Sequence, residues 1–457
     1  MDINKELKQS KWNGHPDFAR IAKTAVLLYR SGHSMSDIMS HLDNEFKPKM
    51  GMKEESVPCS IFGELGSMID EKSHDQLQTA SKLPVAMQSA LMPDAHLGYA
   101  LPIGGVIGLD NAISPHFIGF DIACRMSISI VDINPSDLES NKEYYAKILN
   151  DNTSFGLGAD YTKLRSGKQD HIVMDSPLWD ETEITKMLKD VAHNQLGSSG
   201  GGNHFANLMI GEITQENDTI PDHLSVGDSF VALVTHSGSR KVGHKLATHY
   251  SNLAKAWTEA NAIGIPNGYE WLPLDHSLGE EYWNVMHLMG RYAQANHELI
   301  HDNFIRDVGC QRIFYGENHH NFAWKENING KDMVVHRKGA TPAGVGVFGV
   351  VPGSMGTRTY LVEGLGNPDS LNSSSHGAGR LHSRTKAKQQ HNEVSYKKLI
   401  KNADILAIGV SKDETNQCYK DIDDVMKYQE GSLVRSIGSL FPRVVIMGGD
   451  QKSDDGD

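Results

Sequence analysis

FVALVTHSGSRKVGH, residues 230–244, joins an apolar run to a glycine-containing loop and then to a helix, and it decides the fold class. The run over 230–235 is apolar without interruption, which is typical of a strand that is covered on both faces. Apolar side chains then recur at helical spacing over 242–257. Since strands and helices follow one another without a regular βαβ rhythm, we predict an α+β fold with mixed β-sheets and flanking helices, rather than a doubly wound parallel sheet.

Other elements are predicted on both sides of this stretch. The proline-free segment from Glu281 to about Asp307 predicts one long helix, and the short apolar runs 346–351 and 444–447 predict strands. Residues 17–45 predict one or two amphipathic helices with a glycine-containing turn, SGHS, at 31–34. Such a turn occurs in helix-turn-helix motifs, but it is common in ordinary helix pairs, so we favour a helical pair packed on the main body.

Composition narrows the class of protein. The net charge of −13 argues against a protein that coats nucleic acid non-specifically, although a local basic groove remains compatible with it. The chain has no apolar run of membrane-spanning length and starts without a secretion signal, so we expect a soluble, cytoplasmic protein without a membrane segment. Its four cysteines show no CxxC spacing, so we expect reduced thiols rather than disulfides.

Five segments share one pattern, in which a loop presents a side chain suited to a metal ion or a phosphate. These segments are GFDIACR (119–125), GSSGGGNHF (197–205), THSGSRKVGH (235–244), ENHHNF (317–322) and SSSHGAGRLHSRTKAK (373–388). Each alone is compatible with a structural role, such as a buried thiol or a histidine hydrogen-bonded in a turn. Their recurrence on separate loops favours one shared site.

The candidate ligands form a mixed set. Asp121 and Cys124 lie three residues apart. His204 follows a glycine-rich segment, and His236 precedes one. The doublet 319–320 leaves open which ring faces inward. Thiolate and imidazole suit borderline or soft ions, whereas carboxylate suits harder ions such as manganese. Because one thiolate can bridge two ions, this set could hold two metals, the usual device for reactions at phosphorus.

His376 stands apart from the candidate ligands. It lies in SHGAGR and is followed by four basic residues, Arg380, Arg384, Lys386 and Lys388. An imidazole at this position could be a metal ligand, a general acid or base, or a nucleophile toward phosphorus. An ordinary surface loop beside a basic helix is the alternative. With the nearby loops 334–341 and 352–356, the pattern predicts phosphoryl or nucleotidyl transfer.

Taken together, these segments resemble the RtcB family of RNA-splicing ligases. The resemblance rests on ordered motifs between about residues 57 and 448: MPDAHLGYALPIGG, GFDIAC, GGGNHF, HSGSR, HHN, HRKGAT, PGSMGT, HGAGR with SRTKA, and YKDID. It implies a single catalytic domain over 57–448. Residues 1–50 are then an N-terminal helical extension, and 449–457 an acidic C-terminal tail.

The resemblance implies a manganese- and GTP-dependent ligase that joins an RNA 3′-phosphate or 2′,3′-cyclic phosphate end to a 5′-hydroxyl end, in tRNA splicing or RNA repair. It implies one Mn²⁺ site at Asp121, Cys124 and His204, and a second at Cys124, His236 and His320. It implies that His376 carries the nucleotide (GMP) as a covalent intermediate. An archease-like activator is a further partner that it suggests.

The same resemblance implies a nucleotide site at Asn203, Phe205, Asn207, Ser354, Gly379, Arg380 and Tyr419. Two positions depart from the family pattern: Asn207 replaces a glutamate in GNHFLE, and Met447 replaces a lysine in VVKG. An amide has one acceptor oxygen and can also donate, so we expect relaxed or altered nucleotide choice, with Lys452 a candidate for the missing amine.

Two alternatives to ligation are considered. A metal-dependent phosphoesterase would open RNA 3′-phosphate or cyclic-phosphate ends without ligation, and it would need no adduct at His376. A catalytically silent module that binds RNA ends is disfavoured, because every matched metal position and the nucleophile are present.

Overall fold

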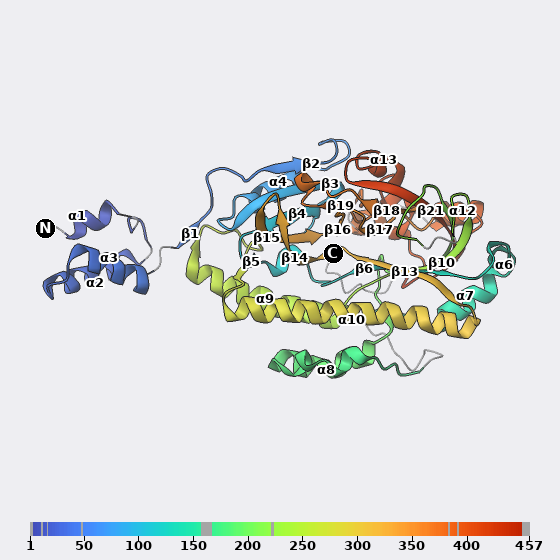
Figure 1. The fold of residues 1–457 in the computed structure, drawn as a ribbon, viewed down its shortest axis with the longest axis horizontal. Coiled ribbons are helices and arrows are strands. Elements are labelled where there is room, and N and C mark those ends of the chain that lie inside the picture. Colours follow the sequence, from blue (N-terminus) through green and yellow to red (C-terminus); the bar gives the residue numbers. More distant parts are fainter. Residues whose placement is uncertain are drawn as a thin grey trace.

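The computed structural model describes residues 3–10, 12–15, 17–46, 49–156, 167–220, 224–382, 384–390 and 393–449. Two larger β-sheets, flanked by helices, make up the main body (Figure 1). The predicted α+β fold with mixed sheets is therefore confirmed. Lys452 and the predicted acidic tail beyond residue 449 lie outside the described residues.

The largest sheet has eight strands and is antiparallel except at one edge. Its order is β13-β6-β10-β9-β21-β18-β17, and β20 pairs in parallel with β21. The strands are β13 (Arg312–His319), β6 (Arg125–Val131), β10 (Ser229–Ser237), β9 (Phe205–Ile213), β21 (Val434–Met447), β18 (Thr359–Gly364), β17 (Phe348–Pro352) and β20 (Leu406–Ile408). The strands predicted over 230–235, 346–351 and 444–447 correspond to β10, β17 and the end of β21.

Alternation along β10 explains its uninterrupted apolar run. Leu233 packs in the cluster that contains Ile300 and Phe304, whereas Val234 belongs to the cluster on the other face. Both faces of this strand are therefore covered, as the sequence predicted. The site is set by the register: His236 at the end of β10 lies opposite Phe205 of β9 and Met126 of β6.

A five-stranded sheet carries the second part of the site. Its order is β14-β15-β4-β3-β2, with β14 (Asn321–Ile328), β15 (Lys331–Lys338), β4 (Ile103–Leu109), β3 (Ala86–His96) and β2 (Cys59–Ile61). Four two-stranded pairs complete the sheets: β1 (Met50–Gly51) with β11 (Ala262–Ile263), β5 (Ala112–Ile113) with β12 (Leu272–Pro273), β7 (Ser154–Phe155) with β8 (Ser198–Ser199), and β16 (Ala340–Pro342) with β19 (Ser373–Ser375).

Helices flank these sheets, and the two longest match the sequence prediction. The helix predicted from residue 242 is α9 (Arg240–Asn261), and the one predicted from residue 281 is α10 (Ser277–Val308), which runs along one side of the main body in Figure 1. The other helices of the main body are α4 (Glu71–Ser81), α5 (Pro115–Ile118), α6 (Pro135–Ser140), α7 (Lys142–Asp151), α8 (Glu183–Gln195), α11 (Arg384–Gln390), α12 (Glu393–Asn402) and α13 (Ile422–Lys427).

The N-terminal segment differs from the prediction. It forms α1 (Ile3–Lys8), α2 (Phe18–Arg30) and α3 (Met35–Glu45), which lie at one end of the molecule in Figure 1. Their apolar cluster draws every member from residues 3–46. The prediction that these helices pack on the main body was therefore wrong, because their apolar faces are buried against one another.

Among the residues that the structure describes, no helix is both long enough and apolar enough to cross a membrane.

Candidate active site

Antiparallel pairing gathers four loops at one edge of the large sheet. Strands β6 and β9 begin at this edge, whereas β10 and β13 end there. Cys124 immediately precedes β6, His204 precedes β9, and His320 follows β13. These residues are far apart in the sequence, but the strand register places their loops side by side.

The loop that carries Asp121 and Cys124 is shaped by its backbone. The N–H of Cys124 donates to the carbonyl of Asp121 (3.2 Å), and Ala123 between them adopts a left-handed conformation at φ 61°. A non-glycine residue in this region signals local strain of the kind that functional sites often hold. The backbone N–H of Ser239 donates to Asp121 Oδ1 (3.1 Å), and a Cβ at Gly238 would collide with the same carboxylate.

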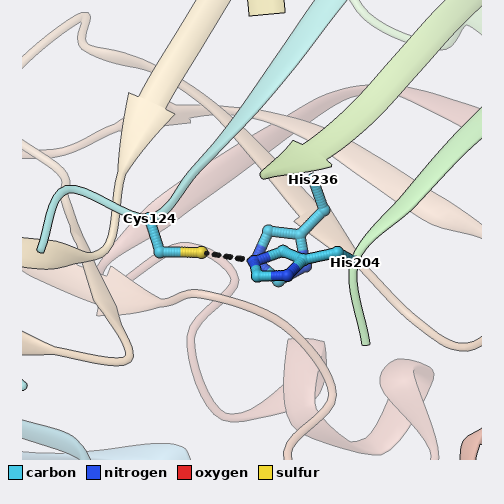
Figure 2. A group of neighbouring side chains, drawn as sticks. All are labelled: Cys124, His204 and His236. Carbon is cyan, nitrogen blue, oxygen red and sulfur yellow. Dashed lines mark hydrogen bonds between the residues drawn. The ribbon is translucent and has the colours of Figure 1, made fainter. Parts of the chain in front are cut away.

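The five predicted metal ligands converge in the structure. Cys124 Sγ lies 3.3 Å from His204 Nε2 and 3.1 Å from His236 Nε2 (Figure 2). His204 Nε2 also lies 3.2 Å from Asp121 Oδ2. His236 Nε2 in turn lies 3.1 Å from His320 Nε2. Cys124 is thus shared between the Asp121 and His204 pair and the His236 and His320 pair.

The protonation state of this cluster fits a metal site. Burial holds the pKa of both His236 and His320 well below the ordinary histidine value, so both rings are neutral. His236 Nδ1 faces the carbonyl of Asn203 at 3.2 Å and therefore carries the proton. The lone pair on Nε2 then points at the sulfur and at His320. A backbone carbonyl that fixes the tautomer in this way is the usual support of a metal-binding histidine.

The histidine doublet is resolved by the same geometry. His320 faces the cluster, and its backbone N–H donates to the carbonyl of Cys124 (3.0 Å). His319 points away and its Nε2 lies 2.6 Å from Arg125 Nη2. Donors of this type, namely thiol, imidazole and carboxylate oxygen, suit a transition ion such as manganese or zinc.

His376 lies beside the cluster and is fixed by a carboxylate. Strand β19 delivers it, and its ring centroid is 5.1 Å from that of His320. His376 Nδ1 and the backbone N–H both donate to Asp94 Oδ2, at 2.7 and 3.2 Å. Asp94 lies near the end of β3 and is fully buried, whereas the imidazole is 18% exposed. This hydrogen bond leaves the lone pair on Nε2, the nitrogen suited to attack a phosphorus atom.

A pocket of about 870 Å³ opens beside His376. Its walls include every nucleotide-type residue that the sequence predicted, together with Met447: Asn203, Phe205, Asn207, Ser354, Gly379, Arg380 and Tyr419. All predicted site residues are therefore brought together in one region, where His376 also meets the cysteine and histidine cluster.

Asn207 and Met447 stand on neighbouring strands of the pocket wall. The register pairs Asn207 with Val445, and Phe205 with Met447. The side-chain oxygen of Asn207 accepts a hydrogen bond from the backbone N–H of Ile446 (3.3 Å). This bond uses one of the two lone pairs on the amide oxygen, so the side chain can offer a ligand its NH₂ donors and one remaining acceptor position.

Two of the basic residues near His376 form ion pairs with a buried carboxylate that the sequence did not indicate. Arg380 Nη1 lies 3.1 Å from Glu414 Oε1, and its guanidinium lies over the ring of Tyr419 with Cζ 5.2 Å from the centroid. Arg384 forms an ion pair with the same buried carboxylate. The segment 334–341, which the sequence predicted as a loop, is instead largely strand β15, and its Arg337 is fully buried against Glu326 and Ser373.

Sequence reasoning missed two carboxylates of this site, Asp94 and Glu414. Asp94 lies inside MPDAHLGY, a motif that was noted without a role for its aspartate. Glu414 lies in KDETN, where no pattern distinguishes it from a surface residue. The roles of Asp94 and Glu414 are evident only in the structure, where β3 and the segment around Glu414 pack against the loop that follows β19.

Known proteins with similar sequences come from one family. The family model described as tRNA-splicing ligase RtcB matches residues 76–448. The chain is 28% identical over 432 residues to the RNA-splicing ligase RtcB of Escherichia coli (strain K12), covering 86% of this chain and 98% of that protein. It is 28% identical over 462 residues to the tRNA-splicing ligase RtcB of Methanococcus maripaludis, covering 86% of this chain and 95% of the relative. The RNA-splicing ligase RtcB homolog 1 of Entamoeba histolytica is 27% identical over 440 residues, covering 82% of this chain and 83% of the relative.

Proposed function

The chain belongs to the RtcB family of RNA ligases, and we propose that it joins an RNA 3′-phosphate or 2′,3′-cyclic phosphate end to a 5′-hydroxyl end. The observation that carries this proposal is the position of His376. Its imidazole is anchored to Asp94 at the point where the pocket that contains Asn203, Phe205 and Tyr419 meets the cysteine and histidine cluster. A nucleophile, a nucleotide pocket and a metal-type cluster in one place are the parts that nucleotidyl transfer requires.

The proposed first step forms an adduct on His376. Nε2 attacks the α-phosphorus of GTP, a nitrogen–phosphorus bond forms, and the bond to the bridging oxygen of pyrophosphate breaks. The imidazole gains positive charge in this step, and the carboxylate of Asp94, 2.7 Å from Nδ1, stabilises it. Covalent catalysis of this kind divides a difficult substitution into easier ones.

The next steps move the nucleotide onto the RNA. An oxygen of the RNA 3′-phosphate attacks the phosphorus on His376 and takes the GMP, which frees the imidazole. The 5′-hydroxyl oxygen then attacks the 3′-phosphorus, GMP leaves, and a phosphodiester is formed. A cyclic end needs hydrolysis to a 3′-phosphate before this sequence begins.

We propose that the ions are two Mn²⁺. Asp121, Cys124 and His204 would hold one, and Cys124, His236 and His320 the other. Their contacts of 3.1–3.3 Å and the neutral rings of His236 and His320 support such a role. When bound, the ions would supply positive charge to phosphoryl oxygens. A cytoplasmic location fits this chemistry, because Cys124 must stay reduced to serve as a ligand. An archease-like activator is proposed as a partner on family resemblance alone.

The decisive experiment is incubation with Mn²⁺ and α-labelled GTP, followed by denaturing gel analysis. We expect a labelled band for the wild type and none for His376→Ala. The exposed His33 on the N-terminal helices provides a matched control, since His33→Ala removes an imidazole far from the pocket.

The same assay separates the ligase from the phosphoesterase alternative. A phosphoesterase would open cyclic-phosphate ends in Mn²⁺ without ever labelling His376. Absence of label in the wild type, together with end-opening activity that depends on Cys124, would replace the ligase proposal with that alternative.

A further inference from the structure

Three cavities meet at Ile103, and His376 lines two of them, the nucleotide pocket and a second cavity. A second cavity of about 660 Å³ lies on the metal-cluster side and is lined by Asp121, Cys124 and His376. A third, a groove of about 1790 Å³, runs past His96. Ile103 lines all three, so the cavities converge at one point. A ligase has to bring a nucleotide and two RNA ends to such a point.

Tyr99 stands between the second cavity and the groove, and it lines both. Its side chain is 48% exposed, although the surroundings hold it firmly. Asn267 Nδ2 donates to its hydroxyl (3.1 Å), and the ring of His116 packs edge-on at 5.0 Å between centroids. Lys338 Nζ donates to its backbone carbonyl (2.5 Å). An aromatic ring that is rigid yet half open to solvent has little conformational freedom left to lose on binding.

The groove on the far side of Tyr99 is lined by four basic side chains. Arg380 and Arg384 are paired with Glu414, whereas Lys72 and Lys420 lie along the same groove as Asp70 and Glu71. Lys420 is held in place, because its Nζ donates to the carbonyls of Pro93 (3.1 Å) and Ala95 (2.7 Å). Basic side chains along a groove that ends at an exposed aromatic ring are the combination that binds single-stranded nucleic acid without reading its sequence.

We propose that Tyr99 stacks on the terminal base of the RNA 3′ end. This inference rests on the proposed function and adds the place where the RNA lies. The terminal phosphate would occupy the cavity lined by the cysteine and histidine cluster and His376, and the preceding nucleotides would follow the groove past Lys420. The 3′ end is assigned because its phosphate must reach both the cluster and His376, and the one cavity that Tyr99 shares with both is the second.

The test measures affinity for an oligonucleotide with a 3′-phosphate by fluorescence anisotropy in Mn²⁺. We expect Tyr99→Leu to bind about tenfold more weakly than the wild type, since one stacked base contributes roughly this much. Tyr99→Phe should restore wild-type affinity, because it keeps the ring and loses only the hydroxyl. The equally exposed Tyr144 on α7 supplies the control variant Tyr144→Leu, with no change expected.

A second oligonucleotide, with an abasic 3′-terminal nucleoside, separates stacking from a change of structure. The wild type should bind it about tenfold more weakly than the intact strand, and Tyr99→Leu should bind the two equally. Equal affinity of Tyr99→Leu and wild type for the intact strand, or an equal abasic penalty in both, would overturn the proposal. Labelling of wild-type His376 without RNA reports on the proposed function independently, so the two failures are distinguishable.

Discussion

The sulfur of Cys124 touches both halves of the proposed metal centre, and this predicts an uneven effect of two substitutions. Cys124 Sγ lies 3.3 Å from His204 Nε2 and 3.1 Å from His236 Nε2, whereas His204 contacts Asp121 on one side only. Cys124→Ala should therefore lose both manganese ions. His204→Ala should lose one and keep the other, since Cys124, His236 and His320 remain.

The bound metal can be counted by plasma mass spectrometry after dialysis. Cys310→Ala is the matched control, because this half-buried thiol precedes the start of β13, at the opposite end of that strand from His320, and its Sγ lies 3.9 Å from the carbonyl oxygen of Ile305. Loss of one ion from Cys124→Ala, or of both from His204→Ala, would contradict a shared sulfur.

The hydrogen bonding of the Asn207 side chain predicts which nucleotides the protein accepts. The side-chain oxygen accepts from the N–H of Ile446, which leaves the amide with one acceptor position and its NH₂ donors. The N1–H and NH₂ groups of guanine are both donors, so a single acceptor position favours guanine less than a carboxylate with two free oxygens would. We expect the wild type to be labelled by ATP and GTP within about tenfold of each other, a ratio worth about 1.4 kcal/mol.

Asn207→Glu supplies a carboxylate acceptor at the same position and should shift labelling toward GTP. Parallel reactions with the four α-labelled nucleotides measure this directly. A strict GTP requirement in the wild type would show that the base is recognised by other groups in the pocket.

Helix α10 buries a histidine network against the large sheet, and this network predicts how stability depends on pH. His301 lies 2.7 Å from Ser129 Oγ and 2.8 Å from Thr235 Oγ1, and burial with nearby Arg312 lowers its pKa to about 3. Below pH 6.5 the unfolded chain takes up a proton at this histidine and the folded chain does not. The free energy of unfolding therefore falls as pH falls from 6.5 toward 3.

For a single histidine this loss is on the order of 1 kcal/mol at pH 5.5. Urea unfolding measures the free energy of unfolding at pH 7.5 and at pH 5.5. The decrease between these two pH values should be smaller for His301→Gln than for the wild type by about this amount. His33→Gln, at an exposed position, should leave the loss unchanged. Identical losses in His301→Gln and wild type would mean that this histidine is already charged in the fold.

How far the elements could be predicted depends on whether their signal is local. Strand β10 and helices α9 and α10 were predicted because their apolar spacing is written in consecutive residues. Convergence of the ligands was expected because they occur in motifs of a resembled family, while their contacts follow from strand register. Asp94 and Glu414 were missed because a carboxylate's partner depends on which distant element packs against it, and sequence spacing carries no such information.

On the scale of the whole molecule, the same limit explains the error at the N-terminus. An amphipathic pattern shows that a helix has a face to bury, but it does not show what covers that face. In the structure Ile21 and Leu42 pack within residues 3–46, so α1–α3 cover one another. The family model also begins only at residue 76. We therefore propose that the N-terminal helices form a unit separate from the catalytic body.

A chain that begins at Lys49 tests this division. It keeps the pairing of β1 with β11 and the hydrogen bond from Lys49 Nζ to the carbonyl of Glu259 (2.7 Å), while it loses the whole N-terminal cluster. A unit of this size buries little apolar surface and is marginal by itself, so the full chain should show a separate transition at lower temperature in calorimetry. The shortened chain should lack that transition, melt within about 2 °C of the main one, and still form the labelled adduct on His376. A fall of the main transition by about 5 °C or more would mean that these helices stabilise the catalytic body after all, through contacts other than their shared apolar core.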